Sequence, residues 1–275
     1  MGCRYEQISH PSLQAPTFVL EGVIVDVRSR RALATLSRAA SLASLLMLAM
    51  VGPTVPTQGQ SAITDMGMAA YNRGDIATAY TLLRQAAEAG DPEGQVNLGY
   101  LYARGQGVPS DQAEALRFYR AAAAQGNSEG MNAIGYKYQF GTGVPANMST
   151  AIGWYCRAVA LGNPRALNNL AIVVSKGLGL PRDVDEARDL WKQAAGLGKA
   201  NAMYNLAISY LGEQPAEGRL WLQQAAEKGQ PDAQNLLRRG GYIGPLPPPV
   251  NESALMEAAP KGAVGHSKVC DGLVS

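Results

Sequence analysis

Histidine is almost absent from this 275-residue chain, which contains only His10 and His266. Both residues lie outside the central part of the sequence, residues 64–239. Ser-His-Asp and Cys-His catalytic sites and histidine-containing metal sites all require an imidazole group. Such sites are therefore excluded from residues 64–239. We expect a protein that is not an enzyme and that binds neither a cofactor nor a metal ion.

An excess of charge of one sign is also missing. Residues 64–239 contain 17 Lys and Arg residues against 16 Asp and Glu residues, a difference of +1. Proteins that bind nucleic acid need a basic surface facing the phosphates, so we expect no nucleic-acid partner. The densest acidic cluster is mixed with arginines, and we interpret it as a helix cap and a solvated helix face rather than a metal site. It consists of Asp183, Asp185, Glu186 and Asp189, together with Arg182 and Arg188.

Long hydrophobic runs are scarce, and the one that stands out is the 13-residue run from Ala39 to Val51. It is shorter than the roughly 20 residues that a membrane-spanning helix needs. Four arginines precede it between positions 28 and 38. A basic segment followed by a short apolar run is typical of a secretory signal. We therefore interpret residues 25–62 as a signal region and expect a periplasmic or secreted protein whose mature form begins between Pro53 and Ile63.

Two alternatives stay open for the N-terminal part. The signal segment can remain uncleaved, and it would then be the only attachment of the protein to a membrane. Residues 1–24 would be an untranslated or unstructured leader if translation begins near Val23 or Val25. Glu6 occupies the position where N-myristoylation needs Ser or Thr, so a lipid on Gly2 is not expected.

The most informative feature of the chain is a repeat with a period of 36 residues. One set of equivalent positions holds glycine: Gly90, Gly126, Gly162 and Gly198. A second set is apolar: Leu98, Ile134, Leu170 and Leu206. Repetition at a fixed period of this size predicts a solenoid, in which each unit buries its apolar face against its neighbours.

Each repeat predicts two helices joined by a turn. In the second repeat, Leu98 and Tyr102 share one face of the first helix, and Gly99 between them lets another helix approach closely. Gly105 ends this helix because glycine adopts a positive φ without penalty. Asp111 is a good N-cap for the second helix, and Glu114 follows it at the spacing of a capping box, as Glu186 follows Asp183. Prolines are expected at the first helical position: Pro92, Pro164 and Pro231.

The pattern extends from Thr64 to Arg239 and predicts five helical hairpins followed by a short capping helix. The fold class is therefore all-α, a right-handed α/α solenoid over residues 64–239. Residues 240–275 begin with a proline-rich linker and continue as a tail without a sustained period, which we expect to be disordered.

These motifs resemble the Sel-one-like repeat, a branch of the tetratricopeptide-repeat superfamily with a 36-residue period. In the second repeat the residues that match the family pattern are Leu98, Gly99, Tyr102, Gly105, Gly107, Val108, Asp111, Ala115, Tyr119, Ala122, Ala123 and Gly126. The resemblance implies a scaffold that binds an unidentified envelope protein or peptide. It also implies that the first helix of each hairpin lines a concave groove.

The same resemblance implies which side chains project into that groove. They are Tyr71, Val96, Tyr100, Arg104, Asn132, Tyr136, Phe140, Asn168, Ile172, Tyr204 and Ile208. Tyrosine combines a large contact area with a polar hydroxyl, which suits peptide recognition. The alternative for Tyr100 and Tyr136 is that they pack between neighbouring hairpins.

A different function is implied by a cysteine-rich secreted branch of the family, which is associated with binding or hydrolysing β-lactams. That branch links each repeat with a pair of cysteines, whereas residues 64–239 contain only Cys156. The defining residues of the branch are therefore missing, and the scaffold is the favoured function.

The two cysteines that follow the signal region are Cys156 and Cys270. Position 156 is equivalent to Arg120, Lys192 and Gln223, so the thiol is expected to face solvent. Exposed thiols in an oxidising compartment tend to pair. We expect a disulfide that holds the tail across the outer side of the array, with two unpaired cysteines as the alternative.

Overall fold

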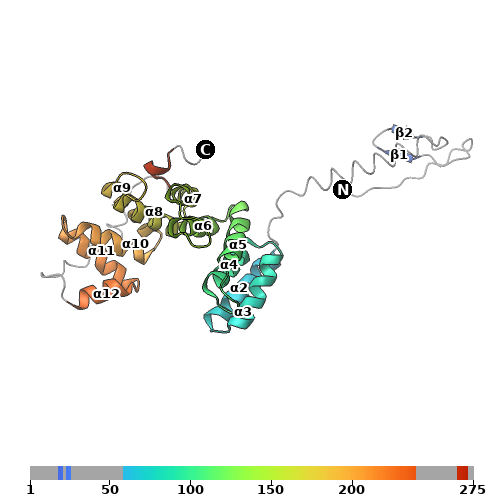
Figure 1. Cartoon of the computed structure of the whole chain (residues 1–275), viewed down its shortest axis with the longest axis horizontal. Coiled ribbons are helices and arrows are strands. Elements are labelled where there is room, and N and C mark those ends of the chain that lie inside the picture. Colours follow the sequence, from blue (N-terminus) through green and yellow to red (C-terminus); the bar gives the residue numbers. More distant parts are fainter. Residues whose placement is uncertain (1–17, 21–22, 26–57, 240–264, 272–275) are drawn as a thin grey trace, which may run out of the picture. The chain divides into compact units, whose positions relative to one another are not determined.

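The computed structural model describes residues 18–20, 23–25, 58–239 and 265–271 (Figure 1). The chain divides into two units, Met1–Val55 and Pro56–Ser275. In the first unit, β1 (Phe18–Leu20) pairs antiparallel with β2 (Val23–Val25). The arginine-rich segment, the apolar run Ala39–Val51 and the proline-rich linker all lie outside the described residues. No helix in the described part of the chain has the length and apolar character needed to cross a membrane.

The described part of the second unit is an array of α-helices in which each helix packs on the next one along the chain. Five hairpins, α2/α3 to α10/α11, are followed by α12, which confirms the predicted helical solenoid with its C-terminal cap. The helices are α2 (Gln58–Asn72), α3 (Ile76–Glu88), α4 (Pro92–Arg104), α5 (Gln112–Ala124), α6 (Ser128–Phe140), α7 (Met148–Ala160), α8 (Pro164–Lys176), α9 (Val184–Gly196), α10 (Ala200–Tyr210), α11 (Pro215–Glu227) and α12 (Pro231–Arg238). The first helix begins earlier than predicted, at Gln58 instead of Thr64.

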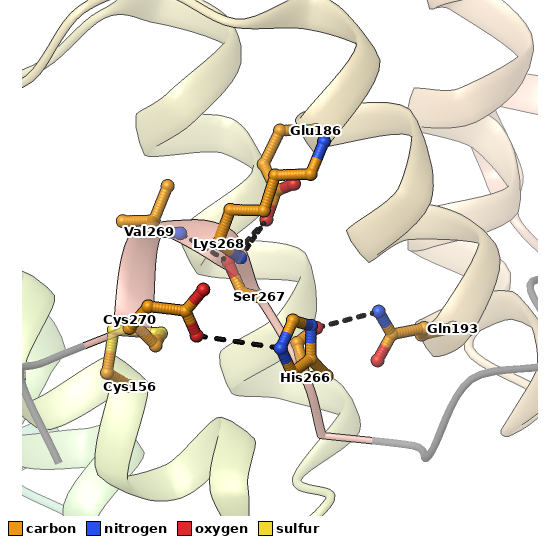
Figure 2. Close-up of a disulfide and its surroundings, with 9 residues drawn as sticks. Cys156, Glu186, Gln193, His266, Ser267, Lys268, Val269 and Cys270 are labelled. Atoms are coloured by element: carbon orange, nitrogen blue, oxygen red, sulfur yellow. Dashed lines mark hydrogen bonds and ion pairs between the residues drawn. A yellow bond between two sulfur atoms is a disulfide. The ribbon is translucent and has the colours of Figure 1, made fainter.

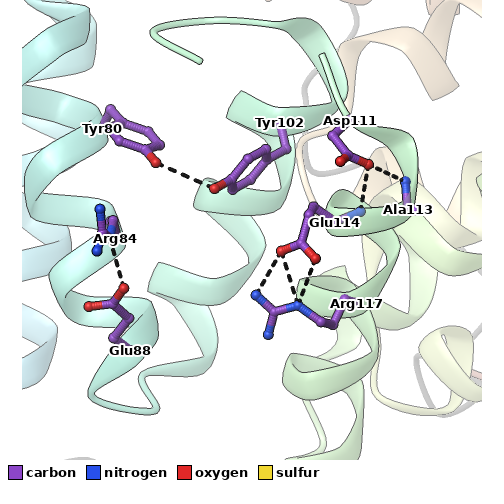
Figure 3. Close-up of polar contacts among 8 residues, drawn as sticks. All are labelled: Tyr80, Arg84, Glu88, Tyr102, Asp111, Ala113, Glu114 and Arg117. Atoms are coloured by element: carbon purple, nitrogen blue, oxygen red, sulfur yellow. Dashed lines mark hydrogen bonds and ion pairs between the residues drawn. The ribbon is translucent and has the colours of Figure 1, made fainter. Parts of the chain in front are cut away.

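The predicted helix boundaries are set by the expected residues. Gly105 ends α4 with a φ of 66°, in the left-handed region. Asp111 caps α5, because its side chain accepts hydrogen bonds from the backbone N–H groups of Ala113 and Glu114 (Figure 3). Proline occupies the start of α4, α8 and α12, where its missing N–H costs no helical hydrogen bond.

The capping box predicted at the start of α5 forms only in part, because the expected contact from the Glu114 side chain to the backbone N–H of the N-cap residue Asp111 is missing. The Glu114 side chain does not bond back to the N-cap but forms an ion pair of 2.8 Å with Arg117 (Figure 3). The backbone N–H of Asp111 instead donates to the carbonyl oxygen of Tyr102, at 3.0 Å. The preceding helix therefore satisfies the donor that a capping-box glutamate would have satisfied, and it ties the hairpin together at the same time.

Glycine allows the two helices of a hairpin to approach closely. A Cβ atom added to Gly99 would lie 2.6 Å from the ring of Tyr119, and one added to Gly135 would lie 2.7 Å from the ring of Tyr155. Each tyrosine comes from the second helix of the same hairpin. The periodic apolar residues Leu98, Ile134, Leu170 and Leu206 are fully buried.

Successive first helices also contact one another directly. Helix α2 contacts α4, α4 contacts α6, and α6 contacts α8. These contacts gather α2, α4, α6 and α8 into one continuous layer. The residues on the free face of this layer are therefore the candidates for a binding surface.

Candidate functional site: a groove along the first helices

A groove with a volume of about 880 Å³ follows the layer of first helices. Residues from all five hairpins line it, and six of the eleven predicted groove residues are among them. These six are Tyr71, Tyr100, Arg104, Asn132, Tyr136 and Asn168. The other five, which lie outside the lining, are Val96, Phe140, Ile172, Tyr204 and Ile208.

Val96 was expected in the groove, and this expectation is wrong, because its side chain is buried and is not among the residues that line the groove. The face of α4 that lines the groove instead carries Asn97, Tyr100, Leu101 and Arg104. Their spacing of three and four residues is that of one helical face. The predicted position is therefore wrong in α4 alone among the second to fourth repeats, because Asn132 and Asn168, at the equivalent positions of the next two repeats, do line the groove.

Phe140 and Ile208 are exposed without lining the groove. Phe140 lies beside Tyr136, with 4.5 Å between the ring centroids. Ile208 occupies the position of Tyr136 two repeats later, at the far end of the array. The groove is therefore concentrated on the first four hairpins, although Lys199 and Asn201 extend it to the start of α10.

The two groove tyrosines have different surroundings. The hydroxyl of Tyr100 donates to Glu129 at the start of α6, and its ring meets that of Tyr119 edge-on at 5.5 Å. Burial, followed by the negative charge of Glu129, raises the pKa of Tyr100 well above its usual value. Tyr136 is 50% exposed. Tyr100 thus packs between hairpins, whereas the ring of Tyr136 is accessible.

Asparagines tie neighbouring first helices together along the groove. The side-chain amide of Asn169 donates to the side-chain oxygen of Asn132 at 2.9 Å, and Asn205 donates in the same way to Asn168. Each pair joins residues 37 positions apart, one repeat plus one residue. Asn132 and Asn168 are buried, so these bonds satisfy amides that would otherwise be costly to bury.

The groove has a positive lining. Four cationic residues line it, Arg104, Lys137, Arg165 and Lys199, and its lining includes no Asp or Glu. Lys137, Arg165 and Lys199 were not predicted, because the almost balanced total charge of residues 64–239 does not show how the charges are divided between the faces of the helices. Counting charge separately on each face of the first helices is the signal that would have found them.

Glu129 lies next to this lining and is already engaged by its neighbours. It accepts hydrogen bonds from Tyr100 and Asn163, and Arg165 pairs with it. Burial opposes its ionisation, but these three hydrogen bonds outweigh burial, so the pKa of Glu129 lies below its usual value. The carboxylate therefore offsets the positive charge of Arg165. It does not pair with the other three cationic residues of the groove, Arg104, Lys137 and Lys199.

The second predicted site is the cysteine pair, which the structure joins by a disulfide with an S–S distance of 2.08 Å (Figure 2). Cys156 on α7 is fully buried, so the expectation that it faces solvent is wrong. The segment 265–271, which includes the short 3-10 helix η1 (Lys268–Cys270), covers it. A comparison of equivalent positions within the array could not reveal a cover supplied from 114 residues further along the chain.

Hydrogen bonds hold this segment on α9 as well. The buried carboxylate of Glu186 accepts from the hydroxyl of Ser267 and from the backbone N–H of Lys268 (Figure 2). The side chain of Gln193 accepts from the N–H of Gly265 and donates to the carbonyl oxygen of His266. The segment therefore lies across two second helices, α7 and α9, and not on the groove.

Known proteins share this architecture. Five consecutive segments, 61–91, 92–127, 128–163, 164–199 and 200–230, match the profile of the Sel1 repeat. The chain is similar to the solved structure of a Sel1 repeat protein from Oxalobacter formigenes, with 27% identity over 82% of this chain and 95% of that one and a TM-score of 0.60.

Two further solved structures are similar. One is c5321, a protective antigen of uropathogenic Escherichia coli with an SLR fold, at 28% identity over 72% of this chain and 44% of that one, with a TM-score of 0.53. The other is the immunity protein Pa5087 of Pseudomonas aeruginosa, at 20% identity over 75% and 82%, with a TM-score of 0.53. The second likeness shows the fold alone. No curated protein matches the sequence.

Proposed function

Because the chain belongs to the Sel1 repeat family, we propose that it is a protein-interaction scaffold that binds a protein or peptide partner along the groove of its first helices. The observation that carries the proposal is the groove itself, about 880 Å³ in volume, with the exposed ring of Tyr136 beside cationic side chains. Tyrosine and arginine are the residue types that most often dominate the energy of protein interfaces.

We further propose that the scaffold acts in the periplasm or outside the cell. The basic segment and the apolar run Ala39–Val51 support export. The disulfide between Cys156 and Cys270 adds support, because structural disulfides persist mainly in oxidising compartments. N-terminal sequencing and the intact mass of the native protein test this proposal. A product that begins at Met1 would contradict export, and one that retains residues 28–51 would show an anchor.

The binding proposal is tested by recovering a partner from an envelope extract with the full chain as bait. The affinity of that partner is then measured for Tyr136→Ala and for Ile208→Ala, a matched control at the equivalent position outside the groove. We expect Tyr136→Ala to weaken binding by roughly tenfold, since exposed aromatic residues at an interface centre are commonly hot spots, and Ile208→Ala to have little effect. Equal affinities for the two variants would place the interface elsewhere.

The alternative of a β-lactam-hydrolysing enzyme gains no support. In the described residues the one disulfide joins the array to the tail segment and does not link the two helices of a repeat. A nitrocefin assay on the purified protein is the direct check, and hydrolysis above that of a folded control protein would reverse the choice between the two functions.

A further inference from the structure

One cation of the groove is buried without a negative partner. Lys137 on α6 is only 5% exposed, and its ammonium group donates to the side-chain oxygen of Gln112, a neutral amide. No carboxylate in the described part of the chain forms an ion pair with it. Burying an ammonium without a counter-charge is unfavourable, and burial accordingly lowers the pKa of Lys137.

Gln112 positions this ammonium group but cannot neutralise it. Its side-chain nitrogen donates to the carbonyl oxygen of Ala103 at 2.8 Å and to the hydroxyl of Ser110 at 3.1 Å. These two bonds fix the orientation of the amide, so that its oxygen faces Lys137. An ammonium group has three donors, and only one of those on Lys137 is used by this contact.

A second unsatisfied group lies close by. The hydroxyl of Thr142 is buried and has no hydrogen-bond partner in the described residues. Thr142 follows Gly141 at the end of α6, and its backbone N–H donates to the carbonyl oxygen of Lys137 at 3.1 Å. Lys137, Thr142 and Gln112 all line the groove. Unsatisfied buried groups of this kind are rare in folded proteins and call for an explanation.

We propose that Lys137 and Thr142 form a subsite for a carboxylate of an acidic peptide bound in the groove, an inference that rests on the proposed scaffold function. The ammonium group pairs with the carboxylate, and the threonine hydroxyl donates a second hydrogen bond to it. Arg104, which is exposed and lines the same groove, adds longer-range attraction. Tyr136 precedes Lys137 on α6 and contacts the neighbouring side chain of the peptide.

The absence of acidic residues from the groove lining agrees with this assignment, because a carboxylate on the protein would compete with that of the ligand. The adjacent carboxylate of Glu129 is held by Arg165 and Tyr100 and does not compete. The groove thus combines a positive lining with one buried ammonium group, that of Lys137, which lacks a counter-charge. A carboxylate of the ligand would supply that counter-charge.

The subsite is tested on the full chain with small carboxylates, using NMR signals of the lysine and threonine side chains at constant ionic strength. Acetate should produce saturable shifts at Lys137 and Thr142, whereas acetamide and chloride should not. Lys137→Met should weaken acetate binding at least tenfold. Lys192→Met is the matched control, since Lys192 lies over the ring of Tyr210 on the second-helix side, and it should leave binding unchanged. Equal binding by Lys137→Met, or equal shifts with acetamide, would overturn the proposal.

A second variant keeps the ammonium group in place. Gln112→Glu puts a carboxylate beside Lys137 within the protein, so it should abolish acetate binding, and because a carboxylate cannot donate to the carbonyl oxygen of Ala103, the variant should melt at a somewhat lower temperature than the wild type. Acetate binding to this variant with wild-type affinity would contradict the assignment.

Two peptide-like probes identify the source of the carboxylate. N-acetyl-glycylglycine offers only a C-terminal carboxylate, and N-acetyl-glutamate α-amide offers only that of a side chain. Saturable binding of either one supports the subsite, the tighter of the two identifies the source, and binding of neither overturns it. The scaffold function is tested separately: it fails if the full chain recovers no partner, and an unchanged affinity of Tyr136→Ala for a recovered partner places the interface outside the groove, whatever the result with carboxylates.

Discussion

Arg165 pairs with Glu129, the residue at the equivalent position of the preceding repeat, with 2.5 Å between the guanidinium nitrogen and the carboxylate oxygen. The separation of 36 residues equals the period of the sequence. Equivalent positions of adjacent hairpins are therefore neighbours in space. Where such a position holds an acidic residue in one repeat and a basic residue in the next, the two side chains can form an ion pair between the hairpins. The asparagine pairs also join adjacent hairpins, with a separation of 37 residues, and several of these contacts can be tested.

Stability should fall on the acid side because of Glu129. Its pKa lies below the usual 4.5, so its stabilising contribution is complete above about pH 4.5 and is lost as the pH falls through the lowered value. We expect Glu129→Gln to cost about 1.5–3 kcal/mol at pH 7, the range for hydrogen bonds to a charged group, and to cost progressively less toward pH 3. Urea denaturation between pH 3 and 7 measures both effects.

Glu93→Gln is the matched control, because Glu93 occupies the equivalent position one repeat earlier and its side chain is exposed. A loss as large in this variant as in Glu129→Gln would show that the contact with Arg165 and Tyr100 is not the cause.

The asparagine pairs should contribute to stability at specific repeats. Asn169→Ala removes the donor to Asn132 and leaves a buried side-chain oxygen unsatisfied, at a cost of about 1–3 kcal/mol. Asn97→Ala, at the equivalent position two repeats earlier, removes a side chain that bonds to no other described residue, and it should change the free energy of unfolding by less than about 0.5 kcal/mol. Chemical denaturation of the two variants, measured side by side, decides whether the pairs matter.

The turns after α4, α6 and α8 should not tolerate a side chain at their second glycine. Gly143 has a φ of 80°, and a Cβ there would lie 2.8 Å from that of Gln112. Gly143→Val should therefore destabilise the fold by about 1–3 kcal/mol or more, because backbone strain and a steric clash act together. Gly153, inside α7, has no atom within 4 Å of an added Cβ, so Gly153→Ala should stabilise the helix by about 0.5–1 kcal/mol. In thermal melts, Gly143→Val should lower the melting temperature and Gly153→Ala should raise it. A shift of both melting temperatures in the same direction would contradict this account of the two glycines.

The disulfide should stabilise the array under oxidising conditions. It closes a loop with a separation of 114 residues, for which chain-entropy arguments give a contribution of roughly 4–5 kcal/mol. Cys270→Ala should lower the free energy of unfolding by about 2–5 kcal/mol and expose residues 265–271 to proteases. A reducing agent should lower the stability of the wild type to that of Cys270→Ala, and insensitivity to reduction would contradict the linkage.

The repeated glycines and apolar residues were sufficient to predict the hairpins, because turns and helix caps depend on residues close together in the chain. Gly105 and Asp111 behave as their local sequence requires. The prediction for Val96 was wrong although Asn132 and Asn168, at the equivalent positions, line the groove. The exposure of one position depends on how neighbouring hairpins pack in each repeat, which the repeat pattern alone does not encode. The prediction that Cys156 faces solvent was wrong because the segment that covers it, residues 265–271, lies outside the array. The lack of a carboxylate partner for Lys137 depends on which acidic residues lie near it in the fold. The total charge of residues 64–239 does not contain this information.

The disulfide between α7 and η1 also determines how the protein would respond to a mechanical load. A pull applied between residue 58 and the C-terminus passes from Cys270 through the sulfur–sulfur bond to Cys156, and it bypasses the chain between them. Helices α8 to α12 lie within the bypassed stretch. Those hairpins would bear no tension while the bond is intact, and only the hairpins before Cys156 would extend under force. Reduction of one bond would transfer the load to the whole array.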